Sequence, residues 1–234
     1  MHSVSDLWRT LLASSGHRKE VKLVIAGVTY GEDKIVDGSL RIDGGLYSEF
    51  GIGNCCARQI EFEIYPQGTI PRQAKIEVFA RLRLGEQVSE WIPKGVFFFS
   101  TRKTDRVTGV LSVHGYDAML KAEEMWLDSS YDAKTWPMPA ATAVADIAAR
   151  MGVEVDSRTV LDAAFPVQYP VDDKGDMTMR EALGRIAVAN AGNWTITDEG
   201  KLLLVGLNSM PAETHYLITE TGSAITFGGV RILV

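Results

Sequence analysis

Residues 20–113 carry short runs of alternating apolar and polar positions, and glycine or proline turns separate these runs. Alternation with a period of two places the apolar side chains on one face of a β-strand. Short strands at near-regular spacing are typical of a β-sandwich or a β-barrel. The first four runs that we predict as strands, all rich in alternating or β-branched residues, span 21–26, 34–42, 57–65 and 75–83.

The stretch from Trp91 to Leu120 continues this meander and contains three consecutive phenylalanines. Proline, glycine and aspartate mark its turns, because each favours a turn conformation for its own physical reason. We expect strands over 87–91, 95–101 and 107–114, with a break at 93–95 and a turn at 104–106.

The phenylalanine run is apolar on both faces of its predicted strand. Phe97 and Phe99 would share one face. Val96 and Phe98 would share the opposite face. Since a strand that is apolar on both faces is covered on both sides, the second face contacts either another element of this chain or another chain.

The N-terminus predicts a short amphipathic helix that a serine at position 3 or 5 could cap. Leu7 lies one helical turn from Leu11, and Trp8 lies one turn from Leu12. This helix packs either on its own domain or on a neighbouring subunit, and the sequence does not separate these alternatives.

A helical pattern replaces the strand pattern after residue 116. Good helix formers over 117–125 predict one helix with Asp117 as its N-cap. Apolar residues at helical spacing over 144–151 predict a second helix, with Gly152 as its stop. A capping-box signature at 178–181 opens a third helix, and a hairpin over 194–205 follows it.

These patterns predict an α+β protein with four segments. The segments are a helical arm (1–16), a β-barrel domain (17–125), a small helix-helix-hairpin α/β domain (126–206) and a strand-like C-terminal segment (207–234). The last segment either returns to the barrel or starts a further domain of a longer chain.

Composition narrows the classes of function. The 234 residues have a formal charge of −6, and the densest basic run is the short turn at 102–106. A nucleic-acid reader carries a basic patch, so we expect no nucleic-acid partner. No apolar run approaches the roughly 20 residues that span a bilayer, and no signal peptide is apparent, so we expect a soluble, unsecreted chain without membrane insertion.

Local motifs for chemistry are weak. His114–Asp117 holds a base, a phenol and a carboxylate, but catalysis needs groups that converge from several elements, and a strand end followed by an N-cap explains the same residues. Gly51–Cys56 lacks the third glycine of a dinucleotide fingerprint. The four histidines have no metal-ligand spacing, and the acidic loop 172–176 lacks the alternation of a calcium loop. We therefore predict no catalytic residue, no cofactor and no metal site.

The only cysteines, Cys55 and Cys56, are adjacent in the sequence. Neighbouring side chains of a strand point to opposite faces, and a vicinal disulfide would strain the backbone. We therefore predict two free thiols.

The order of features resembles a known family. An FGIGN segment precedes a strand, a GYDAM junction follows the meander, and a unit that begins MTMREALGRIA and ends GNWTITDEGKLLL comes last. This succession covers nearly the whole chain. It resembles the N-terminal half of the tail hub proteins of tailed bacteriophages and prophages, which cap the tail tube in the baseplate.

The resemblance implies a tail-tube-like β-barrel with the small α/β domain attached. It implies a non-enzymatic structural protein of the virion tail, present in the bacterial cytoplasm during assembly; a contractile injection system other than a phage would look the same. Hub proteins form rings that join the tail tube to spike or tail-tip proteins, so we expect those partners and a homo-oligomer, a trimer or else a hexamer. The residues that we expect at the subunit interface are Trp8, Phe97, Phe98 and Phe99.

Two functions of other classes stay open at the level of sequence. A tail-associated hydrolase, either a peptidase or a muralytic enzyme, is one, although no residue matches such a module. A receptor- or carbohydrate-binding module of the same particle is the other. Its stacking platforms would be the dispersed tryptophans Trp91, Trp126, Trp136 and Trp194.

Overall fold

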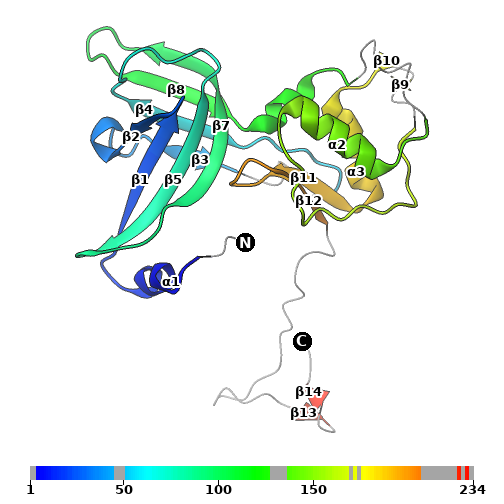
Figure 1. The fold of residues 1–234 in the computed structure, drawn as a ribbon, viewed down its shortest axis with the longest axis horizontal. Helices are drawn as coiled ribbons and strands as arrows, with labels where there is room; N and C mark the ends of the chain where they lie inside the picture. The colour runs from blue at the N-terminus through cyan, green and yellow to red at the C-terminus, as the bar shows by residue number, and fades with distance from the viewer. Residues whose placement is uncertain are drawn as a thin grey trace.

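The computed structural model describes residues 4–44, 51–126, 136–168, 171–172, 175–206, 226–227 and 230–231. A curled β-sheet and a smaller body of helices and a hairpin lie side by side (Figure 1). The chain therefore has the α+β composition that the sequence predicts. Across the described ranges, no helix combines the length and the apolar character that a membrane crossing requires.

Eight strands form one antiparallel sheet. Seven of them follow the order β2-β1-β5-β7-β8-β4-β3, and β6 pairs with β5. Their bounds are Arg18–Ile25 (β1), Val28–Tyr30 (β2), Arg41–Asp43 (β3), Gln59–Ile64 (β4), Lys75–Leu84 (β5), Gln87–Val88 (β6), Ile92–Thr104 (β7) and Leu111–Tyr116 (β8).

The inward face of this sheet builds the first core. Every second residue of β5 is buried from Ile76 to Leu82, which is the alternation that the sequence predicts. Leu23 of β1 and Phe62 of β4 lie far apart in the strand order, yet they belong to the same core. The sheet therefore curls until strands near its two ends share one interior.

The structure does not show the predicted closed barrel. β2 pairs only with residues 23–25 of β1, and within the described part of the chain no strand pairs with residues 18–22 on that side. At the opposite edge of the sheet, the predicted strand 34–42 is broken. Ile35 forms an isolated bridge with Ile64, a turn follows at Asp37 and Gly38, and β3 begins only at Arg41. Because glycine and aspartate favour the turn, the two edges are not joined by a hydrogen-bonded ladder.

Two boundaries in the phenylalanine stretch differ from the prediction. β7 runs without interruption through the predicted break at 93–95, where its register against β5 shifts instead. Gly95 makes this possible with a φ of +149°, a conformation that L side chains rarely adopt. The following turn closes at 105–109, so β8 begins at Leu111 rather than at residue 107.

The smaller body contains α2 (Ala140–Met151), α3 (Met179–Ala189) and the hairpin of β11 (Gly192–Ile196) and β12 (Leu202–Gly206). The helix signals are confirmed. Gly152 ends α2 with a left-handed φ of 70°, and Thr178 and Glu181 form the capping box of α3. The predicted helix over 117–125 is instead a 3₁₀ helix, η2 (Ala118–Glu123), because Met125 already pairs with Thr178.

The second core extends beyond the predicted 126–206 segment. It unites α2, α3 and the hairpin with Cys55, Met119 and Ala122, which lie earlier in the chain. The smaller body is thus built from three separate stretches of sequence.

The N-terminal helix α1 (Asp6–Ala13) packs on its own domain, near β5. Leu11 is fully buried there. The backbone N–H and the hydroxyl of Ser5, its N-cap, donate to the Glu90 carboxylate at 2.8 and 2.7 Å. Leu7 and Leu12 of the same helix stay exposed.

Most of the predicted C-terminal segment 207–234 lies outside the described residues. Within it, β13 (Thr226–Phe227) and β14 (Val230–Arg231) pair with each other. A second short pair, β9 (Val171–Asp172) and β10 (Gly175–Asp176), falls in the predicted acidic loop.

Candidate functional site at the junction of the two cores

Phe97 occupies the inner face of β7 and has no exposed surface. Its ring lies over Gly95, where a Cβ atom would be 2.3 Å from the ring carbon Cε2. The guanidinium carbon of Arg58 lies 5.6 Å from the ring centroid. Phe99 is half-buried against the same core, so the predicted pairing of Phe97 with Phe99 on one face is confirmed.

Phe98 faces the other way and packs against the second core. The ammonium nitrogen of Lys121 lies 4.0 Å from the centroid of its ring and donates to the Met151 carbonyl at 3.1 Å. Val96, on the same face, contacts the β11–β12 turn, where a Cβ atom on Gly200 would lie 3.1 Å from a Val96 methyl. The smaller body of the same chain therefore covers the second face of this strand.

The predicted interface residues thus have partners within the chain. Phe97 and Phe98 contact the two cores, and Trp8 is half-buried on α1. A role for Trp8 and the phenylalanines in a subunit contact stays a prediction.

Arg58 connects three segments at the junction. Its Nη1 atom lies 2.7 Å from the carboxylate of Asp198 in the β11–β12 turn. Its Nη2 atom donates to the Lys94 carbonyl of β7 at 2.8 Å. The ion pair is largely shielded, with the two side chains 16% and 27% exposed, so it is stronger than a surface pair.

Asp117 holds the start of η2 against the sheet. Its two carboxylate oxygens accept the backbone N–H groups of Arg58 and Met119, both at 3.0 Å. Burial raises the pKa of Asp117 to about 6, although the two N–H donors and nearby arginines oppose the shift. His114 instead lies on β8 with its ring against Tyr116, at a centroid distance of 4.7 Å. The N-cap interpretation of Asp117 is confirmed, and the run His114–Asp117 does not converge on a pocket.

The glycine run at 51–53 joins the bodies through the backbone. Gly53 donates to the Gly192 carbonyl at 2.9 Å, and Trp194 donates to the Asn54 carbonyl at 2.8 Å. Gly53 has a φ of +87°, and a Cβ atom there would lie 2.4 Å from the Cγ2 methyl of Val188 on α3. Gly53 therefore permits close packing between the bend at residues 52–53 and helix α3.

Neither Cys55 nor Cys56 forms a disulfide, in agreement with the prediction. Cys55 is buried in the second core, and burial raises the pKa of its thiol to about 12. Its sulfur is therefore a packing group at neutral pH.

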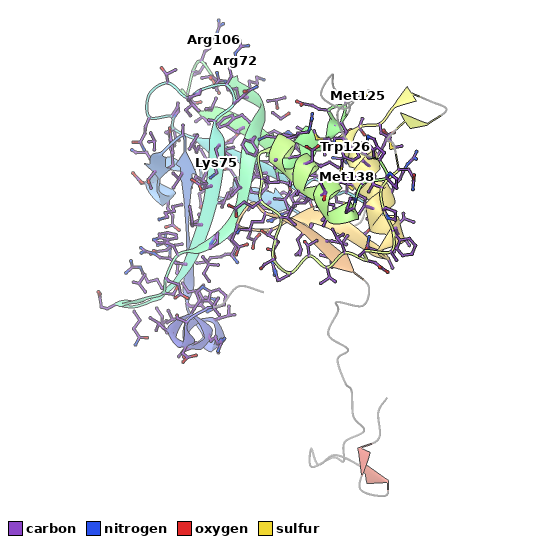
Figure 2. All side chains as sticks on the ribbon, turned by 45° about the vertical axis from the view of Figure 1, so that its right-hand side comes forward. Arg72, Lys75, Arg106, Met125, Trp126 and Met138 are labelled. Atoms are coloured by element: carbon purple, nitrogen blue, oxygen red, sulfur yellow. The ribbon has the colours of Figure 1, made fainter. Side chains whose placement is uncertain are left out.

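The tryptophans do not share a surface. Trp126 and Trp194 are fully buried, and their indole N–H groups donate to Asp146 and to the Leu183 carbonyl, both at 2.8 Å. Figure 2 shows Trp126 close to Met138 within the smaller body. Trp136 packs against Trp126 at a centroid distance of 5.7 Å. This arrangement does not form the stacking platform of a carbohydrate site.

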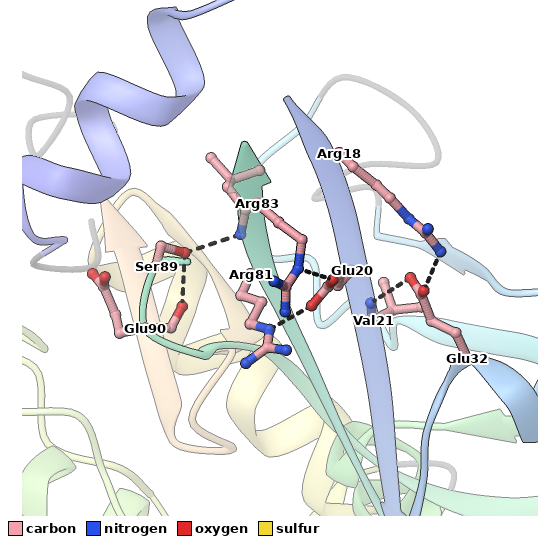
Figure 3. A network of polar contacts seen from close by, with 9 residues as sticks. Arg18, Glu20, Val21, Glu32, Arg81, Arg83, Ser89 and Glu90 are labelled. Atoms are coloured by element: carbon pink, nitrogen blue, oxygen red, sulfur yellow. Dashed lines mark hydrogen bonds and ion pairs between the residues drawn. The ribbon is translucent and has the colours of Figure 1, made fainter. Parts of the chain in front are cut away.

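Trp91 lies on the outer face of the sheet, where cations cover it. Lys22 Nζ and the guanidinium carbon of Arg81 lie 4.5 and 4.4 Å from its ring centroid. Figure 3 shows Glu20 between Arg81 and Arg83, at 2.6 and 2.5 Å. Burial alone would raise the pKa of Glu20, yet the two arginine hydrogen bonds outweigh burial and lower it. On this face, Glu20 therefore engages Arg81 and Arg83, and the Trp91 ring engages Lys22 and Arg81.

A cavity of about 830 Å³ lies where the two sheet edges are unjoined. Apolar side chains such as Val21 and Leu40 line it, and Arg18 and Glu32 stand among its polar residues. Glu32 pairs with Arg18 and accepts the N–H of Val21 at 3.4 Å (Figure 3). Among the described residues, no group of three or more histidine, cysteine or acidic side chains is arranged to hold a metal ion.

Two solved structures of tail proteins, one of them from a prophage, share this fold. The 43 kDa tail protein of prophage MuSo2 from Shewanella oneidensis aligns with a TM-score of 0.54 and 16% identity, over 86% of this chain and 59% of that one. The tail protein from Neisseria meningitidis MC58 aligns with a TM-score of 0.51 and 15% identity, over 83% of this chain and 53% of that one. The chain thus spans less than two thirds of either protein. No protein-family model and no curated protein sequence matches it.

The partners of Arg58 and Gly53 at the junction could not be predicted from the sequence. Arg58 meets Asp198 across 140 positions. Gly53 was visible as a turn-forming residue, but its partner Val188 is one exposed position on a helix. Only the packing of the two bodies brings these residues together.

Proposed function

We propose that this chain is a non-enzymatic structural component of a phage or prophage tail. The observation that carries the proposal is the fold shared with two tail proteins, one of them from a prophage, over more than four fifths of the chain. The junction supports it, because Arg58, Asp117 and Gly53 lock the sheet and the smaller body into one block. A block of this kind suits a part that transmits load within a particle.

Within the tail, we assign the chain to the baseplate hub. The order of sequence features supports this, and so does the curled sheet, which we infer acts as a tail-tube-like barrel whose unjoined edges meet a neighbour on assembly. A ring of three copies, or else of six, would join the tail tube to spike or tail-tip proteins. Its place would be the virion tail, after assembly in the bacterial cytoplasm.

The ring is tested by the mass of the purified chain in solution. Light scattering and native mass spectrometry should give three times the chain mass of 25.7 kDa, or else six times. A mass of one chain at every concentration up to the solubility limit would contradict the ring.

The non-enzymatic assignment has its own test. The purified chain should leave a peptidoglycan zymogram and a casein gel uncleared over several hours. Clearing that persists through a second purification would favour a tail-associated hydrolase instead.

A further inference from the structure

The end of the sheet farthest from α1 carries an exposed hairpin. β7 and β8 pair up to Thr104 and Leu111, and every residue from 100 to 109 is exposed. The loop 65–74, which joins β4 to β5, lies at the same end. Figure 2 shows Arg72 of this loop and Arg106 of the hairpin at the same end of the molecule. We call residues 65–74 and 100–110 the basic end.

Internal bonds fix the shape of the basic end. The Asp105 carboxylate accepts the backbone N–H groups of Val107 and Thr108 at 2.7 and 3.3 Å. The backbone of Asp105 also bonds to Val110 at 2.8 Å. Arg102 Nη1 donates to the Ile70 carbonyl at 2.7 Å and ties the hairpin to the neighbouring loop. A surface that is already ordered loses little entropy on binding.

Charge and an apolar tip distinguish this surface. The basic end holds four cations and one carboxylate, Asp105, in a chain of net charge −6. Asp105 is engaged with the backbone of its own turn. Val107 at the tip is 94% exposed, and in the described part of the chain no other large hydrophobic side chain is as exposed. A rigid apolar knob surrounded by cations fits an apolar socket with a carboxylate rim.

We propose that the basic end docks into such an acidic-rimmed socket on a different protein of the same particle. A membrane-inserting loop would present larger aromatic or leucine side chains, and a reader of single-stranded nucleic acid would present stacking rings. Contacts between copies of this chain are assigned above to the unjoined sheet edges, which leaves the basic end for a different protein. The proposal rests on the tail assignment.

The test places a photo-crosslinker at the tip of the full chain, in the bacterium that makes the particle. One variant carries Val107→benzoylphenylalanine. The matched control carries the same residue at Val160, which is 80% exposed in the smaller body. Purified particles are irradiated, and adducts are identified by mass spectrometry. We expect an adduct from position 107 with another particle protein, on a peptide rich in aspartate or glutamate, and a yield at least fivefold lower from position 160.

Charge reversal adds a second measurement. Arg72→Glu together with Arg106→Glu should lower the adduct yield from position 107 at least fivefold, whereas Lys201→Glu should leave it unchanged, because Lys201 lies on the smaller body in an exposed ion pair with Glu154. The inference would be overturned by equal adduct yields from positions 107 and 160, or by an adduct with a second copy of this chain. It would also be overturned if the charge reversal left the yield from position 107 unchanged. Particles that contain the chain but give no adduct would overturn it as well. Particles that lack the chain would instead defeat the tail assignment.

Discussion

Gly53 and Gly68 adopt nearly the same backbone conformation, with φ of +87° and +84°, in different surroundings. An added Cβ atom meets nothing within 4 Å at Gly68, whereas at Gly53 it lies 2.4 Å from the Cγ2 methyl of Val188. Gly68→Ala should therefore cost only the strain of a left-handed alanine, about 1 kcal/mol. Gly53→Ala adds an overlap between two packed elements and should cost about 3 kcal/mol, measured by urea unfolding.

The double variant Gly53→Ala, Val188→Ala separates overlap from backbone strain. Removing the Val188 methyls should recover most of the difference between the two glycine sites, because Val188 is itself exposed and contributes little core. If Gly53→Ala and Gly68→Ala lower the free energy of unfolding equally, the close approach of Val188 to Gly53 does not contribute to the cost.

Asp117 predicts a specific pH dependence of stability. Burial raises its folded pKa to about 6 from an ordinary value of 3.8, so the folded state binds this proton more tightly than the unfolded chain. The resulting stabilisation is fully present below about pH 3.8 and is lost as the pH rises through 6. Asp117→Asn removes it, so the variant should lose about 2 to 3 kcal/mol relative to the natural chain between pH 7 and pH 4.

The other carboxyl groups titrate in both the natural chain and the Asp117→Asn variant, so their contributions to the pH dependence cancel in the difference. Urea unfolding at intervals of half a pH unit gives the difference directly. A difference that stays constant from pH 7 to pH 4 would mean that Asp117 titrates normally in the folded protein.

At the scale of elements, Arg58 holds β7 and the β11–β12 turn against the start of β4. Arg58→Met keeps much of the apolar stem but leaves Asp198 and the Lys94 carbonyl without these bonds. We expect the free energy of unfolding to fall by about 2 to 4 kcal/mol, since breaking a shielded ion pair leaves a poorly solvated charge. Calorimetry with limited proteolysis should also show earlier cleavage between the two bodies.

Arg41 supplies the matched control, because its contact with Asp43 is exposed and long, at 3.5 Å. Arg41→Met should change stability by less than about 0.5 kcal/mol. If both arginine variants lose the same stability, Arg58 does not act as the clamp.

The elements themselves were largely predictable because their signals are local. Each signal depends only on residues close by in the sequence, as in the alternation in β5, the capping box at Thr178 and the helix stop at Gly152. The continuous course of β7 was not predictable, since the bulge at Gly95 depends on the Phe97 ring and on the partner strand. The break at the sheet edge, by contrast, has a local cause, because Asp37 and Gly38 form a turn inside the predicted strand 34–42.

At the scale of the whole molecule, the chain is two cores fixed into one block, with a basic end that projects from the sheet. At the junction, the smaller body of the same chain covers the outer face of the phenylalanine strand. The assembly that we propose can therefore use other surfaces, and among the described residues the unjoined sheet edges, α1 and the basic end are exposed.

The most direct test of the structural assignment is quantitative mass spectrometry of purified tail particles from the bacterium that carries the gene. The account predicts peptides of this chain in particles washed at high salt, at three or six copies per particle. Particles with intact tails that contain no peptide of this chain would contradict it.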